Sequence, residues 1–440
     1  MKYQIFLKDC AMNKKILLMI FSFIFIFLIS GCSDSTTTTL SLVTSSDSLT
    51  SETTTVLSNV SVVENDDLVG DPSYIKWEGR YEYKGDEEIK QVALYHTATG
   101  FTVDFYGTEL KVSFIHTCTS ELSGTNIYYN FSLDDETIPN PIDGRTFYLE
   151  DDKTDYEVTI ISGLTLGHHT IKCLKMDEAK DAYTSIYRFK TDGYFYERDK
   201  DADNSHLKFM FICASGGSGF GSLGYTTSSS VSIERTRANS SSLHAFNYLA
   251  ARMYDADTMF IASSGWGLVF DRSRSIKDVF DYTGVTVENN VEGAKKTALW
   301  DHTSYIPDVI IFNIGGNDTT KSSFILNEYK AGVIEIVEKL HTLYPNAVML
   351  WTRTKGSNCG TYAMNALRNS GIYGEGYIKE VVIPQVGDDG TYGASSHNSF
   401  LTHITTASKI SQALEEYFNL KPTRENVNFD DFKNIIQVVS

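Results

Sequence analysis

The feature that most constrains the fold of this chain is a regular alternation, from Leu207 onward, of short apolar runs with segments of helical periodicity. Uninterrupted apolar runs are typical of strands that are buried on both faces, as in parallel sheets. When helices separate such strands, the pattern predicts a parallel sheet covered on both faces, a three-layer α/β/α fold. The predicted strands are 209–212, 259–262, 309–314, 348–351 and 381–383, and the predicted helices are 243–254, 327–343 and 404–418.

The preceding part of the chain, residues 74–197, has a different texture. Short runs of alternating apolar and polar residues recur there, separated by Gly, Asp and Asn, and no amphipathic helix interrupts them. Period-two alternation predicts antiparallel strands, and we expect a sandwich of about 8–10 of them. The clearest runs are 92–95, 101–105, 110–114, 127–133, 156–161 and 169–175.

The N-terminus carries the pattern of an export signal. Lys14 and Lys15 precede an apolar run, residues 16–29, that is too short for a comfortable membrane span. Small residues then precede Cys32, which resembles the lipobox of bacterial lipoproteins, where the cysteine thiol carries the lipid. We therefore expect cleavage after residue 31 and an extracellular, cell-surface lipoprotein anchored to a bacterial membrane through Cys32. An ordinary signal peptide or an anchor helix is the alternative.

Composition then completes the predicted organisation of the chain. A Ser- and Thr-rich segment follows Cys32, and it has too few large apolar residues to offset the entropy of ordering, so we expect a linker. The predicted parts are a signal peptide at 1–31, the linker at 32–70, a β-sandwich domain at 71–200, an α/β domain at 201–425 and a C-terminal tail at 426–440.

Charge and cysteine content exclude two classes of function. The formal net charge is −18, so the chain lacks the basic surface that nucleic-acid binding requires. The cysteine spacing fits no zinc pattern, and we expect neither a metal nor a cofactor. Cys118 and Cys173 could form a disulfide in an oxidising compartment, or pack as small buried hydrophobic residues.

Chemistry-bearing residues follow the ends of the predicted strands, where parallel sheets bind ligands. Ser215 lies on a Gly-rich turn after the first strand, where a base can reach its hydroxyl. Gly265 follows the second strand, and its N–H can approach a substrate oxygen closely. Asn317 follows the third strand and can donate to an oxyanion, while Asp318 can hold its loop through backbone hydrogen bonds. His397 precedes the last helix, from which it can reach toward Ser215.

The order Ser, Gly, Asn, His resembles the SGNH (GDSL-like) hydrolase superfamily. Further segments look like carbohydrate esterase family 2 and its N-terminal domain. The resemblance implies an SGNH hydrolase fold with a flavodoxin-like parallel sheet, preceded by a jelly-roll domain. It implies Ser215 as nucleophile, His397 as general base and acid, and the Ser215 N–H, the Gly265 N–H and the Asn317 side chain as oxyanion donors. The matching segments are 77–80, 100–108, 163–170 with Lys175, 248–252 and 264–267.

The sequence departs from the superfamily pattern at two places. Cys213-Ala214 replaces the Gly-Asp that usually precedes the nucleophile, and no carboxylate lies just before His397. Some members of the family that it resembles rely on a Ser–His dyad in which a backbone carbonyl orients the His. Asp388 or Asp389 could take that role instead. His403 is a competing histidine, but its helical position suits packing better.

The resulting prediction is a serine esterase that removes O-acetyl groups from carbohydrates, such as acetylated xylan or other polysaccharides and oligosaccharides, through an acyl-enzyme. The alternative is a catalytically impaired relative that binds glycans as a surface lipoprotein, and a catalytic Cys213 is a more distant reading. Aromatic side chains near the motif loops could stack on sugar rings or simply pack in the core. These aromatic residues are Phe220, Trp266 and Trp300.

Overall fold

The computed structural model describes residues 62–63, 68–85, 90–118, 126–142, 144–150, 155–180, 182–270, 275–286 and 291–439. These residues belong to one compact unit, Ser58–Ser440. The predicted signal peptide and Cys32 lie outside the described residues. Within the described ranges, no helix combines the length and the apolarity that crossing a bilayer would require.

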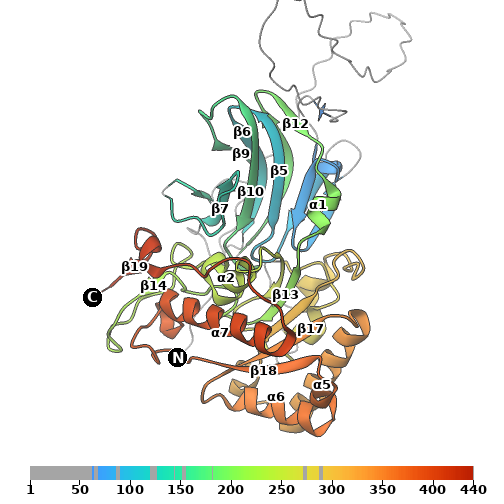
Figure 1. Ribbon diagram of the computed structural model, residues 1–440, viewed down its shortest axis with the longest axis vertical. Coiled ribbons are helices and arrows are strands. Elements are labelled where there is room, and N and C mark those ends of the chain that lie inside the picture. The colour runs from blue at the N-terminus through green and yellow to red at the C-terminus, as the bar shows by residue number, and fades with distance from the viewer. Residues whose placement is uncertain are drawn as a thin grey trace, which may run out of the picture. The chain divides into compact units, whose positions relative to one another are not determined.

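Two antiparallel sheets form the N-terminal region, residues 62–196, which we call the β region (Figure 1). One sheet has seven strands and the other has five. The seven are β1 (Val62–Val63), β12 (Tyr194–Tyr196), β5 (Gly100–Gly107), β10 (Gly167–Lys175), β7 (Ile127–Leu133), β8 (Thr146–Leu149) and β2 (Ile75–Glu78). The five are β3 (Tyr81–Gly85), β4 (Lys90–Leu94), β11 (Ala182–Thr191), β6 (Leu110–Cys118) and β9 (Asp155–Ile161).

The two antiparallel sheets share one apolar core, so the described residues form the expected sandwich, although its seven and five strands exceed the predicted 8–10. Alternate residues of facing strands, such as Val103 on β5 and Phe114 on β6, are fully buried in it. Leu68 and Val69 belong to the same core, so the end of the predicted linker is part of the sandwich. Cys173 is a buried free thiol in this core, and the Cys118–Cys173 disulfide is therefore not formed.

A five-stranded, wholly parallel sheet lies at the centre of the following region, residues 208–438, which we call the α/β region. The apolar runs of the sequence form its strands, as predicted. The first strand in the chain lies between the second and the third, the arrangement of a doubly wound sheet. The order is β15 (Asp257–Ala262), β13 (Lys208–Cys213), β16 (Val309–Asn313), β17 (Val348–Thr354) and β18 (Ile378–Ile383).

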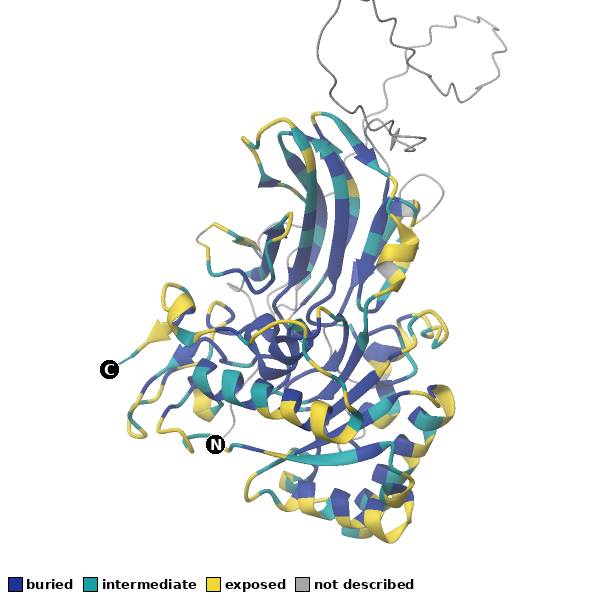
Figure 2. Cartoon of the chain, in the orientation of Figure 1, coloured by how far each residue is buried: buried dark blue, intermediate teal, exposed yellow. Residues whose placement is uncertain are grey.

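Helices cover both faces of the parallel sheet, which confirms the three-layer prediction. On one face α2 (Phe246–Arg252) and α7 (Phe400–Phe418) share a core with the strands. On the other face α5 (Leu326–Leu343) and α6 (Asn358–Asn369) do so. Helices α5, α6 and α7 bury one side and expose the other, as their mixed colouring in Figure 2 shows, whereas α2 is buried almost throughout. The shorter helices are α1 (Lys200–Asn204), α3 (Ile276–Val279) and α4 (Val291–Lys295).

The segment predicted as a C-terminal tail packs on the α/β region. Phe432 and Ile436 join the core beside α2 and α7. Strand β19 (Gln437–Val438) pairs in parallel with β14 (Gly224–Tyr225), which belongs to the loop after β13. The predicted limit at residue 425 therefore does not mark the end of the packed structure.

Candidate active site

The first strand end of the parallel sheet places Ser215 on a tight turn. The Ala214 N–H donates to the Asn313 carbonyl on β16 (3.1 Å), and the Ser215 carbonyl accepts from the Phe220 N–H (3.1 Å). The Ser215 side chain is half-buried, and neither its hydroxyl nor its N–H hydrogen-bonds to any described residue. Both groups are therefore available to a ligand.

The neighbouring strand end supplies a second unpaired N–H. Gly265 has φ of +82°, a left-handed conformation that glycine adopts without the strain of a Cβ. Its N–H donates to no acceptor among the described residues. One Asn317 Nδ2 proton goes to the Trp266 carbonyl (2.7 Å), so the second remains available beside the same turn. The predicted oxyanion donors therefore come from adjacent strand ends.

Asp318 holds this loop in the way that the sequence predicted. Its buried carboxylate accepts from the backbone N–H groups of Leu268 (2.7 Å), Val269 (2.8 Å) and Phe270 (2.8 Å). Burial raises the pKa of Asp318, although the three N–H groups lower it in part. The carboxylate ties the turn after β15 to the turn after β16.

A small cavity of about 160 Å³ opens beside the Ser215 turn. Both Ser215 and Asn317 line it, and its far wall is formed by the end of β17 and the start of α6. Sequence reasoning did not identify this wall, because Thr352, Cys359 and Gly360 belong to no recognisable motif.

His397 lies at the other side of the Ser215 turn. Its ring packs on the Phe220 ring, with centroids 4.5 Å apart, and its Nδ1 donates to the Ser395 carbonyl (2.9 Å). Ser395 and Ser396 adopt φ values of +50° and +59°, which are unusual for residues other than glycine. Neither Ser215 Oγ nor His397 Nε2 hydrogen-bonds to a described residue, so the two are not bonded to each other. Such contacts often tighten only when substrate binds.

Burial holds the pKa of His397 below its ordinary value. The Ser395 carbonyl and the carboxylate of Glu178 raise this pKa in part, whereas Lys180 and Arg235 lower it. The imidazole is therefore neutral near pH 7. A neutral ring with its proton on Nδ1 presents a basic Nε2.

Glu178 is a functional candidate that sequence reasoning missed. It comes from the β region, only 2% of it is exposed, and its carboxylate binds Ser264 (Oγ at 2.7 Å) and Ser218 (Oγ at 3.0 Å). Burial alone would raise the pKa of Glu178, but Lys180, Arg235 and the bonds from Ser264 lower it below its usual value. Nothing in the local sequence marks this residue, because its partners lie about 40 and 86 positions away.

The candidate orienters Asp388 and Asp389 are engaged elsewhere. Asp388 accepts from Lys355 Nζ (3.2 Å), and Asp389 accepts from the hydroxyls of Thr391 (2.7 Å) and Thr402 (2.8 Å). Neither carboxylate hydrogen-bonds to His397, whose Nδ1 contacts the Ser395 carbonyl instead.

Two of the three candidate sugar-stacking residues are wrongly assigned. Trp266 is 0% exposed and packs in the core, because its turn points the indole inward against His96 of the β region. Trp300 lines a separate cavity with Lys208 and Asp257, at the amino-terminal edge of the sheet and thus opposite Ser215. Phe220 alone lies at the site, against His397.

Cys213 and His403 also have packing roles. Cys213 is fully buried, and burial raises the pKa of its thiol to about 12, so it is not an accessible thiolate nucleophile. His403 is buried on α7, its Nδ1 accepts the Phe246 N–H (3.2 Å), and burial lowers its pKa to about 3.

Comparisons with known proteins agree with this architecture. The chain is 23% identical over 356 residues to the cellulase/esterase CelE of Acetivibrio thermocellus. The match covers 78% of this chain but only 39% of the length of CelE. A family two carbohydrate esterase from Clostridium thermocellum, solved in complex with cellohexaose, superposes with a TM-score of 0.64 at 21% identity, covering 78% of this chain and 99% of that one. An acetyl xylan esterase from the rumen bacterium Butyrivibrio proteoclasticus gives 0.64 at 16% identity, covering 82% and 99%. No protein-family profile matches the chain. The chain therefore has the fold of the family two carbohydrate esterases.

Proposed function

We propose that this protein is a serine esterase that removes O-acetyl groups from carbohydrates through Ser215 and His397. The observation that carries the proposal is the convergence of an unpaired hydroxyl, two unpaired N–H groups and one amide proton at adjacent strand ends, on the turns of Ser215, Gly265 and Asn317. Such donors stabilise the oxyanion of acyl transfer. The relatives named above are esterases, which supports the same reading.

In the proposed reaction, Ser215 Oγ attacks the acetyl carbonyl carbon while His397 Nε2 takes the hydroxyl proton. The carbonyl oxygen becomes an oxyanion that accepts from the two N–H groups and from Asn317 Nδ2. When the tetrahedral species collapses, His397 returns the proton to the departing sugar oxygen and an acetyl-serine remains. Water, deprotonated by His397, then attacks this ester; His397 returns the proton to the departing Ser215 Oγ, which releases acetate and restores the hydroxyl.

The cavity of about 160 Å³ beside Ser215 supports a small acyl group. It suits an acetyl group better than a long acyl chain. Phe220, half-buried beside His397, is the remaining candidate for contact with a sugar ring.

The experiment is acetate release from p-nitrophenyl acetate and from acetylated xylan by the full chain and by Ser215→Ala. Loss of the nucleophile should lower kcat by at least about 10⁴-fold. The exposed loop residue Ser229 provides the control, because Ser229→Ala should leave activity unchanged. Equal turnover by wild type and Ser215→Ala would refute the proposal.

The second candidate function is glycan binding without efficient turnover. The absence of a hydrogen bond between Ser215 and His397 favours it, as does the cellohexaose complex of the Clostridium thermocellum relative. Calorimetric titration of the wild type with cellohexaose, in parallel with the acetate assay, separates the two functions. Binding without acetate release would select the second.

We further propose that the protein acts outside the cell, anchored to a bacterial membrane through Cys32. The support is the apolar run with small residues before Cys32 in the sequence. Cys32→Ser should move the protein from the membrane fraction to the soluble fraction of the expressing bacterium and abolish labelling by a radioactive fatty acid. Unchanged membrane attachment would contradict the lipid anchor.

A further inference from the structure

Glu178 connects the β region to the turns that carry the proposed oxyanion donors. It follows strand β10, and its carboxylate accepts from both the N–H and the hydroxyl of Ser264, the latter at 2.7 Å. It also accepts from Ser263 Oγ (3.4 Å). Ser264 directly precedes Gly265, so this carboxylate fixes the peptide that presents the Gly265 N–H.

The same carboxylate also contacts the nucleophile turn. Ser218 Oγ lies 3.0 Å from Glu178 Oε2 and 3.2 Å from the Ser215 carbonyl. The single hydroxyl proton of Ser218 is shared between these two acceptors, so Ser218 links the carboxylate to the Ser215 turn. One buried group thus bridges the two strand ends whose N–H groups would hold the oxyanion.

Two cations keep this carboxylate ionised and pack on the aromatic ring beside His397. Lys180 Nζ lies 3.3 Å and Arg235 Nη2 lies 3.6 Å from Glu178 Oε1. The charged groups of Lys180 and Arg235 also lie 5.0 and 4.8 Å from the centroid of the Phe220 ring. The Arg235 N–H donates to Ser395 Oγ (3.1 Å), so the arrangement extends to the turn that orients His397.

We propose that Glu178 is a positioning residue of the active site, through which the β region fixes both oxyanion-donor turns. The inference rests on the proposed esterase function. It makes the β region a working part of the catalytic centre, in addition to any role it has in binding glycans.

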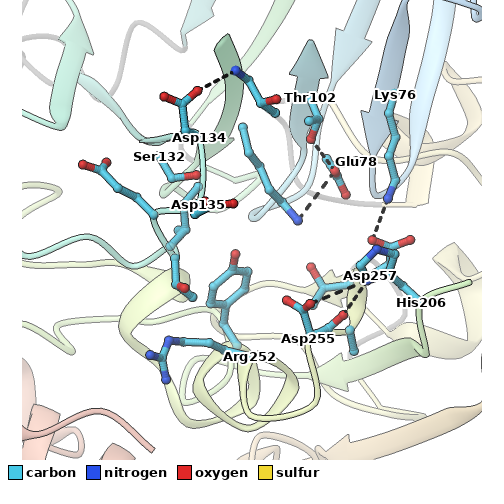
Figure 3. A pocket seen from close by; sticks show the side chains of 18 of the residues that line it. Lys76, Glu78, Thr102, Ser132, Asp134, Asp135, His206, Arg252, Asp255 and Asp257 are labelled. Carbon is cyan, nitrogen blue, oxygen red and sulfur yellow. Dashed lines mark hydrogen bonds and ion pairs between the residues drawn. The ribbon is translucent and has the colours of Figure 1, made fainter. Parts of the chain in front are cut away.

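A second contact between the two regions serves as the matched control. Lys76 on β2 pairs with Asp257 on β15 at 2.8 Å, as the dashed line in Figure 3 shows. Asp257 begins the strand whose other end leads to Ser264, so the two contacts join the same regions at opposite ends of β15. The Lys76 pair lies in a separate cavity of about 490 Å³, away from the residues of the proposed site.

The first test compares Glu178→Gln and Glu178→Ala with Lys76→Gln, in the full chain. Misplaced oxyanion donors should lower kcat by about 10²-fold in Glu178→Ala, and less in Glu178→Gln, which keeps one acceptor oxygen. KM should change little, because the turns act on the transition state. Lys76→Gln should keep the wild-type kcat. If Lys76→Gln lost as much kcat as Glu178→Ala, any broken contact between the two regions would have the same effect. That result would overturn the proposal.

The pH profile adds a readout that a merely structural role would not move. The charged and titratable groups that face His397 are Glu178, Lys180, Arg235 and the buried His403. The negative charge of Glu178 favours protonated His397, so Glu178→Gln should shift the acid limb of kcat/KM to lower pH. Lys76→Gln should leave the limb in place.

Amide hydrogen exchange tests positioning without relying on activity. Removing the acceptor of the Ser264 N–H should speed exchange in the 263–267 turn of Glu178→Ala at least tenfold, and Lys76→Gln should not. Unchanged exchange would overturn the proposal even in an active enzyme. If Glu178→Ala exchanges faster but the wild type shows no esterase activity, positioning is supported while the proposed function is rejected, so the two failures are distinguishable.

Discussion

The imidazole Nδ1 of His397 donates a hydrogen bond of 2.9 Å to the backbone carbonyl of Ser395. A carbonyl only accepts, so this bond places the ring proton on Nδ1 and leaves Nε2 as the base. Ser395 is itself held on its amino side, since its N–H donates to the Ile233 carbonyl (2.8 Å). In the proposed reaction, this carbonyl takes the place that a carboxylate has in a Ser-His-Asp triad.

The first prediction follows from this arrangement. Because Asp388 pairs with Lys355 and not with His397, Asp388→Asn should leave kcat unchanged. His397→Ala should lower kcat by at least about 10⁴-fold, because it removes the base. Steady-state hydrolysis of p-nitrophenyl acetate measures both. A large loss in Asp388→Asn would mean that this carboxylate orients the histidine during turnover.

The second prediction concerns the pH dependence of activity. Burial lowers the pKa of His397, and only the neutral imidazole can accept the proton of Ser215. The value of kcat/KM should therefore rise with pH to a plateau, with its midpoint below the ordinary histidine pKa of about 6.5. A profile from pH 4 to pH 8 checks this, and a midpoint above 6.5 would contradict it.

The third prediction tests the Gly265 turn. Gly265→Ala adds a Cβ at φ of +82°, and relief of that strain should displace the N–H and lower kcat by about 10²-fold. Gly144 is the matched control, since its φ is +86°, no atom lies within 4 Å of an added Cβ, and it lies in the β region. Gly144→Ala should cost some stability but no activity. Equal kcat values in the two variants would remove Gly265 from the proposed oxyanion site.

The fourth prediction concerns stability. Asp318→Ala leaves three N–H groups without an acceptor, two of them buried, which should lower the free energy of unfolding by about 3 kcal/mol. Asp308 accepts a single exposed N–H, from Lys208, so Asp308→Ala should cost about 1 kcal/mol or less. Urea unfolding monitored by circular dichroism compares them, and similar losses would contradict the assigned role of Asp318.

The fifth prediction concerns stability against pH. Burial lowers the pKa of His96, His244 and His403 to about 3. Below about pH 6.5 the unfolded chain binds protons that the folded chain does not, so each histidine should lower the free energy of unfolding by about 1.4 kcal/mol per pH unit. This loss runs from about pH 6.5 down to the folded pKa near 3 and is absent above pH 6.5.

The variant His96→Phe provides the test of this slope. It removes one such group, so the unfolding free energy should fall less steeply between pH 6 and pH 4 than in the wild type. Urea titrations at several pH values measure the two slopes. Identical slopes would show that His96 is protonated in the folded protein.

Much of the fold was predictable because buried positions recur along a strand or helix with a regular spacing of apolar residues. The runs that became β13 and β16 are apolar throughout because helices cover both of their faces, and the strands of the β region alternate because one face is solvated. Helix α6 was not predicted because most of its buried residues are small, namely Cys359, Gly360, Ala363 and Ala366, so its buried face has few large apolar side chains. The strands at residues 62–63 and 437–438 were not predicted, because two residues are too few to show an alternating pattern.

The sequence by itself determined which residue types follow each strand, and parallel pairing then brought Ser215, Gly265 and Asn317 to one edge of the sheet. Only the tertiary structure decided which groups hold them. Trp266 turns into the core, Ser395 offers a peptide carbonyl to His397, and Glu178 reaches across from another region to Ser264. These contacts depend on the local backbone conformation and on how the β region packs against the α/β region. Neither of these two features produces a local sequence pattern, so the contacts could not be predicted from the sequence.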